Sequence, residues 1–439
     1  MRKTKRFLWV IGLILSSQFF SGQEKLSVNL KELFSLADQN NRQLQILTNN
    51  QKIAQEHIKE EKQKLLPSID ATLAVSYMGD GYITDRNFSH GFSIDIPKLG
   101  NNFVLEAKQL IYAGGAAKTA IEMAKTNLTI SELETETNRQ NLRFGITGYY
   151  LELLKLRNQR QILLKNIEQT KKLIVQIQAK QNQGVALKNN ITRYELQRQS
   201  QDVALLKLDN TVTILNNELV KILKLPVGTI LDIQNEDLDV LTNVEAFSKD
   251  FWETEAQQNS TVLKTTNLQI QQALRGEKLA KTDKLPQIFA FAGNYFNGPV
   301  MIEIPVLNNN FNYWNVGVGI KYNLASLYKT QTKQNQAKLA VLNAQENQNI
   351  VKEQLSNDIE AARIRFDETK DVYKTHLKGV ELASQNYTII KNRYINDMAL
   401  TTEMLDAENT KIDAELQAAN SQINILFQYY QLKKLTGTL

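Results

Sequence analysis

The chain of 439 residues carries one sequence pattern twice. Residues 36–80 resemble the segment 254–299 at an offset of 219, which pairs Pro67 with Pro286 and Tyr77 with Phe296. Residues 182–197 and 395–410 align at an offset of 213. Self-similarity of this kind indicates that one structural unit occurs twice. We therefore predict a first repeat over 23–226, a linker over 227–245 and a second repeat over 246–439.

Each repeat contains two segments with the periodicity of a β-strand. Apolar side chains occupy every second position of residues 68–78, and the same alternation recurs in 102–112, 287–296 and 313–322. A period of two is typical of a strand whose two faces meet different environments. Strands of about ten residues are long enough to cross a membrane at a tilt.

Four such strands cannot close a barrel around a lumen, and an open edge inside lipid would leave backbone amides without partners. Three copies of the chain would supply twelve strands, which can enclose a pore. One face of these strands should then contact lipid. We expect lipid contact for Ile69, Leu73, Val75, Tyr77, Phe103, Leu105, Phe289, Phe291, Trp314, Val316, Val318 and Ile320.

Long helices follow the second strand of each repeat. Apolar or small residues recur every seven positions from Ile121 to Ile177, and again from Ile359 to Tyr394. A sustained seven-residue repeat indicates helices packed as coiled coils. The predicted fold is mostly α, with long antiparallel coiled-coil hairpins forming an α-barrel, four strands per chain, and a twelve-stranded transmembrane β-barrel in a homotrimer.

The N-terminus and the composition restrict the class of protein. A basic segment, MRKTKR, precedes a short apolar stretch, which predicts a secretory signal peptide over 1–22. Four of the basic residues lie in the first six positions, and removing them lowers the formal charge from +6 to +2, so a nucleic-acid partner is not expected. The chain has no cysteine, which excludes disulfides and thiolate metal sites.

No group of residues suggests catalysis. His57, His90 and His376 are scattered without the spacing of metal ligands, and YAGGAAKT at 112–119 lacks the spacing of a phosphate-binding loop. We therefore expect neither an enzyme nor a cofactor or metal.

Several motifs occur together in a fixed order. They are LKELFSLADQNNRQL near the start, LLPSI and KLPQI before the first strand of each repeat, QLIYAGG before the first long helix, NQGVALKNNITRYELQ and MALTTEMLDAENT at the helical turns, and the closing QYYQLKKLTGTL. In these features the chain resembles TolC-like outer-membrane efflux proteins over essentially all of the mature sequence. Two departures are YNLASLYKT, where many relatives have a glycine pair, and Asp397, where a glycine is usual.

The resemblance implies a passive channel in the outer membrane of a Gram-negative bacterium, extending into the periplasm. Such a homotrimer would receive small molecules or polypeptides from an inner-membrane pump through a periplasmic adaptor, or membrane fusion protein. The alternatives are a periplasmic adaptor and a coiled-coil scaffold. The duplicated hairpin argues against the first, and the strand alternation argues against the second.

The resemblance also implies three groups of functional residues. An acidic ring at the periplasmic aperture falls at Glu403 and Asp406, although a solvated helix face would look the same. Polar latches of the closed aperture would join Arg193 or Arg393 to Asp397 or Asp406, although exposed ion pairs are common. Adaptor docking is implied for the hairpin tips, which a plain helical turn would explain equally well: Gly184, Val185, Ala186, Leu187, Met398, Ala399 and Leu400.

Overall fold

The computed structural model describes residues 25–234 and 248–439. The predicted signal peptide over 1–22 and residues 235–245 of the predicted linker lie outside the described residues. The chain divides into two compact units. The hairpin unit comprises Met1–Asn41, Arg143–Ala246 and Arg365–Tyr430, and the sheet unit comprises Arg42–Leu142, Phe247–Ile364 and Gln431–Leu439. Both units therefore contain segments of both sequence repeats.

The sheet unit contains four long antiparallel strands. They are β2 (Ser68–Tyr77), β5 (Leu99–Ala113), β7 (Gln287–Gly298) and β8 (Phe311–Lys321). Their order in the sheet is β2-β5-β7-β8, so the two repeats meet where β5 pairs with β7. Among the described residues, β2 and β8 each pair with one neighbour only, which leaves both edges of the sheet open. A short hairpin of β3 (Gly81–Thr84) and β4 (Gly91–Ile94) lies in the loop between β2 and β5.

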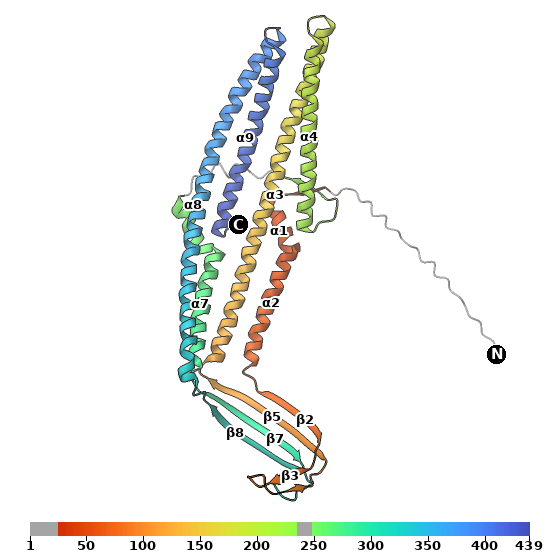
Figure 1. The fold of residues 1–439 in the computed structure, drawn as a ribbon. Helices are drawn as coiled ribbons and strands as arrows, with labels where there is room; N and C mark the ends of the chain where they lie inside the picture. Colours follow the sequence, from red (N-terminus) through yellow and green to blue (C-terminus); the bar gives the residue numbers. More distant parts are fainter. Residues whose placement is uncertain (1–24, 235–247) are drawn as a thin grey trace, which may run out of the picture. The chain divides into compact units, whose positions relative to one another are not determined.

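Helices of the sheet unit lead into and out of these strands (Figure 1). Helices α2 (Arg42–Gln63) and α7 (Thr261–Thr282) precede β2 and β7, and each ends shortly before the proline that its repeat carries. Proline disfavours helical geometry at the residue before it, so the chain changes to extended structure there. Helix α6 (Lys249–Asn259) leads into α7, and Ser260 lies between them and caps α7 by accepting a hydrogen bond from the Leu263 amide.

The register of the sheet corrects part of the predicted lipid-facing set. Residues directly opposite one another in antiparallel strands share a face. The pairing runs from Ile69 through Ala107 and Ala292 to Val316, which places Ile69 and Val316 on the same face. Ten of the twelve predicted residues lie on this face, which we call the apolar face: Ile69, Leu73, Val75, Tyr77, Phe103, Leu105, Trp314, Val316, Val318 and Ile320.

Phe289 and Phe291 lie on the opposite face, which contradicts the prediction for these two residues. Phe291 pairs with Lys108 on one side and Gly317 on the other. The Lys108 ammonium lies 4.4 Å from the centre of the Phe289 ring. A Cβ atom on Gly317 would lie 2.8 Å from the Phe291 ring, so the glycine provides the space that the ring occupies. These phenylalanines pack along the sheet instead of projecting from its apolar face.

The hairpin unit is helical apart from one short parallel pair, β1 (Lys25–Val28) with β6 (Ile230–Ile233). Strand β6 occupies part of the predicted linker. Helix α1 (Leu30–Asn40) begins at a capping box in which Asn29 and Glu32 bond each other's backbone amides. Helix α3 (Ala116–Asn182) and α4 (Lys188–Leu223) form one hairpin, and α8 (Ser326–Ile395) and α9 (Thr401–Thr436) form the other (Figure 1).

The predicted seven-residue pattern marks the buried side of these helices. Leu156, Leu163, Thr170 and Ile177 of α3 are buried, as is Tyr387 of α8. The core near the hairpin turns comprises Leu173, Ile177, Ile191, Tyr194, Tyr387 and Met404. At the other end of the unit, the buried Tyr150 hydroxyl donates to the Gln234 carbonyl at 2.7 Å. No helix within the described ranges has the length and apolarity needed to span a membrane.

Candidate functional site

The turns of the two hairpins have equivalent backbone structures. The Val185 amide donates to the Lys180 carbonyl at 3.0 Å, and the Met398 amide donates to the Arg393 carbonyl at 2.8 Å. These six-residue bonds close Schellman motifs, which end a helix with a residue in the left-handed region. That residue is Gly184 in the first turn, with a φ of 76°, and Asp397 in the second, with a φ of 62°. Aspartate tolerates this region better than most residues, so the departure from glycine preserves the turn.

Exposed apolar side chains project from both turns. Val185, Leu187, Met398 and Leu400 are each more than half exposed. Ala186 instead packs against the buried core of the hairpin unit. Of the seven predicted docking residues, four therefore present exposed apolar side chains, and Gly184 shapes the first turn.

The predicted acidic pair lies at the start of α9. The Glu403 carboxylate accepts a hydrogen bond from the Leu400 amide at 2.8 Å, so it caps the first turn of the helix. Asp406 is exposed, and its side chain has no hydrogen-bond or ion-pair partner among the described residues. A capping role therefore accounts for Glu403 within one chain, whereas Asp406 is free to contribute to a surface field.

None of the predicted latch pairs is present within the described residues of the single chain. Asp397 forms an ion pair of 2.7 Å with Lys180 of α3, not with Arg193 or Arg393. Arg393 donates to the Met398 carbonyl within its own turn at 3.1 Å. Arg193 is exposed and has no side-chain partner in the described parts of the chain.

Sequence reasoning missed Lys180. A basic residue in the last turn of a helix is favoured by the helix dipole, and this signal could have drawn attention to it. The Lys180 ammonium also donates to the Ile395 carbonyl at 2.8 Å, so one side chain of the first hairpin holds the turn of the second.

A buried carboxyl lies close to the same turns and was also missed. Glu408 of α9 is 1% exposed and accepts a hydrogen bond from the Thr170 hydroxyl of α3 at 2.9 Å. Burial raises the pKa of Glu408, although the Thr170 hydrogen bond and the nearby Lys411 and Lys391 act in the opposite direction. Burial likewise raises the pKa of Tyr387 to about 12.

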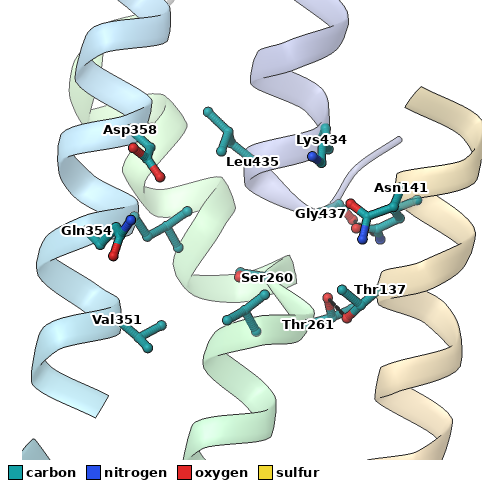
Figure 2. Close-up of a pocket in the computed structure, with 13 residues that line it drawn as sticks. Thr137, Asn141, Ser260, Thr261, Val351, Gln354, Asp358, Lys434, Leu435 and Gly437 are labelled. Carbon is teal, nitrogen blue, oxygen red and sulfur yellow. Dashed lines mark hydrogen bonds between the residues drawn. The ribbon is translucent and has the colours of Figure 1, made fainter. Parts of the chain in front are cut away.

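A pocket of about 350 Å³ lies in the sheet unit, between α3, the start of α7, α8 and the end of α9 (Figure 2). The Thr137 and Thr261 hydroxyls are hydrogen-bonded at 2.6 Å, and the Gln140 amide donates to the Gly437 carbonyl at 3.1 Å. These bonds join helices from both repeats, so the polar lining stabilises the packing around the pocket. No cluster of three metal-ligating side chains occurs within residues 25–234 and 248–439.

Comparison with known proteins tests the predicted resemblance. Residues 33–223 match the family model described as outer membrane efflux protein. The matched residues cover most of the first repeat, so this part of the chain is similar to outer-membrane efflux proteins. The predicted resemblance to TolC-like proteins is thereby confirmed, as is the outer-membrane location of a Gram-negative efflux channel that extends into the periplasm. No curated protein matches the sequence closely enough to count as a relative.

Solved structures show the same fold over most of the chain. CusC, described as forming a transmembrane channel, has a TM-score of 0.78 at 15% identity, with 93% of this chain and 92% of that chain covered. The outer-membrane channel OprN has a TM-score of 0.75 at 13% identity, with 93% of this chain and 90% of that chain covered. VceC of Vibrio cholerae, an outer membrane protein, has a TM-score of 0.72 at 16% identity, with 93% of this chain and 96% of that chain covered. The predicted mostly helical fold with four strands per chain is confirmed.

Outer-membrane efflux channels are trimers that work with adaptors in tripartite pumps, and the family is a class of channels rather than of enzymes. The predicted function as an outer-membrane efflux channel is confirmed.

Proposed function

We propose that three copies of the efflux protein assemble side by side into one passive exit duct. The observation that carries the proposal is the four-stranded sheet with two open edges. An open edge leaves a row of amides unsatisfied, which lipid does not tolerate, and pairing β2 of one copy with β8 of the next removes every edge. Twelve strands then surround a lumen wide enough for a water-filled channel.

The two faces of the sheet support this arrangement. The apolar face carries side chains such as Leu73, Trp314 and Val318, each more than two-thirds exposed in the single chain. The opposite face carries Asp70 directly across from Glu106, and the Tyr295 hydroxyl donates to Glu106 at 2.8 Å. Charged groups belong on the water side of a membrane barrel, so the apolar face contacts lipid and the opposite face lines the lumen.

The hairpin turns form the periplasmic end of the duct in this proposal. Threefold symmetry would bring three copies of Glu403 and Asp406 around one axis, and such a ring of carboxylates favours cations. The exposed apolar side chains at Val185, Leu187, Met398 and Leu400 would provide the contact surface for the adaptor. The adaptor connects the duct to an inner-membrane pump, which selects the exported compound.

Disulfide cross-linking tests the assembly directly, because the chain has no native cysteine. One cysteine is introduced on β2 and one on β8 at lumen-facing positions, and the membrane-extracted protein is oxidised. We expect covalent trimers for the β2 and β8 pairs that come into register. Matched pairs on β5 and β7, which are already neighbours within one chain, should give no product larger than one chain. If no β2 and β8 combination gives covalent trimers, the proposed assembly is wrong.

A further inference from the structure

One glutamate differs completely in environment from its counterpart in the other repeat. Glu408 of α9 corresponds to Glu195 of α4 under the offset of 213. Glu195 is exposed, whereas Glu408 is 1% exposed. The Thr170 hydroxyl bonds one of its oxygens, Oε1, and the other oxygen, Oε2, is buried without a hydrogen-bond partner in the described structure.

Side chains from all four helices of the two hairpins surround this carboxyl. Thr170 comes from α3, Tyr194 from α4, Tyr387 and Lys391 from α8, and Lys411 from α9 itself. The Tyr194 hydroxyl is also buried without a hydrogen-bond partner among the described residues. Burial raises the pKa of Tyr194, and the nearby Glu408 charge raises it further.

Neither nearby lysine neutralises the carboxyl fully. The Lys411 ammonium lies 4.8 Å from the centre of the Tyr387 ring and 3.5 Å from the Glu415 carboxylate. The Lys391 ammonium lies 5.8 Å from the same ring. Within the described residues Glu408 makes no ion pair of its own. An ionised carboxylate with one unbonded oxygen is costly in such surroundings, and a neutral carboxyl is much less so.

We propose that Glu408 is a proton-binding site that holds the two hairpins together, and that release of its proton loosens α9 from α3 and α4. The proton comes from solvent and resides on Oε2. The neutral group keeps the hydrogen bond from Thr170 through Oε1, and its uncharged Oε2 is much less costly to bury than an unbonded carboxylate oxygen. The ionised group requires water, which reaches it only when α9 separates from its neighbours.

The consequence for transport rests on the proposed function. If the hairpin turns form the periplasmic aperture, proton release from Glu408 favours opening and proton uptake favours closure. The native packing binds the proton more tightly than a loosened state does, so the closed arrangement is favoured as the pH falls.

Two measurements on the detergent-extracted full-length protein test the site without using transport. Infrared difference spectra should show a protonated carboxyl band that persists at neutral pH and is absent in Glu408→Gln. Spin labels on cysteines introduced at the exposed Thr192 of α4 and Thr402 of α9 should report a longer and broader distance as the pH rises. Glu408→Gln should keep the short distance at every pH.

The matched control is Glu195→Gln, which removes the same carboxylate at the exposed position of the other repeat. It should leave both the infrared band and the pH-dependent distance unchanged. Thr170→Val removes the donor to the carboxylate, so the midpoint of the distance change should move up by roughly one pH unit, while Thr170→Ser should restore it.

The proposal is overturned if the protonated band is absent from the wild-type protein, if Glu408→Gln retains it, or if the distance does not change with pH. These outcomes are independent of the assembly. Channels that fail to form in bilayers while the band and the distance change are present would count against the proposed function alone.

Discussion

Lys180 of α3 and Asp397 of the α8–α9 turn form an ion pair of 2.7 Å that joins the two hairpin turns of one chain. The Lys180 ammonium also bonds the Ile395 carbonyl, so its position is fixed by two contacts. The side chains are 30% and 60% exposed, which places the pair at the surface. Its effect should therefore be on the position of the turns more than on overall stability.

Asp397→Asn should increase the open probability of single channels in planar bilayers. The substitution removes the charge but suits the left-handed backbone, so the free energy of unfolding should change by less than about 1 kcal/mol. Lys172→Ala breaks the exposed pair with Glu168 further along α3 and serves as the control. Equal open probability for Asp397→Asn and the control would show that the Lys180 contact does not restrain the turns.

Glu403→Gln combined with Asp406→Asn should reduce cation selectivity, measured as the reversal potential across a salt gradient. These isosteric changes remove the carboxylate charges, while the amide oxygen introduced by Glu403→Gln can still accept a hydrogen bond from the Leu400 amide. Selectivity should fall more for Asp406→Asn alone than for Asp413→Asn, an exposed position on the same helix. An unchanged reversal potential in the double variant would mean that these carboxylates form only a solvated helix face.

Val316→Arg should destabilise the assembled protein by about 2–4 kcal/mol if this position lies near the middle of the bilayer. Val316 lies on the apolar face, so the change would place a charge in lipid. The neighbouring Asn315 points to the other face, and Asn315→Arg should be tolerated. The yield of folded trimer after membrane extraction measures the difference. Similar losses for both variants would reject the assignment of the two faces.

The thermal stability of the hairpin unit should depend on pH through Glu408. Because burial raises the pKa of this carboxyl in the folded chain, the folded state binds the proton more tightly than the unfolded state. The stabilisation is complete at pH values below the unfolded pKa and is lost as the pH rises through the folded pKa. Glu408→Gln should therefore have a higher melting temperature than the wild-type protein at high pH. The difference between the two melting temperatures should shrink as the pH falls. A difference in melting temperature that does not vary with pH would indicate that titration of Glu408 does not cause the pH dependence.

The sequence by itself determined the elements and their order. Alternation of apolar residues predicted the strand beginning at Ser68, and the seven-residue period predicted the buried side of α3, because both patterns depend only on the local geometry of one element. The repeats followed from comparing two segments of the chain that lie 219 positions apart, which requires no knowledge of how they pack.

Only the tertiary structure decided how separate elements face each other. Phe289 and Val316 both lie in alternating strands, but the register that places them on opposite faces is a property of the pairing between strands. Glu195 and Glu408 occupy equivalent positions of two similar helices, and packing buries only the second. Likewise the choice of Lys180 as the partner of Asp397 depends on how the two hairpins meet, since 217 positions separate these residues in the sequence.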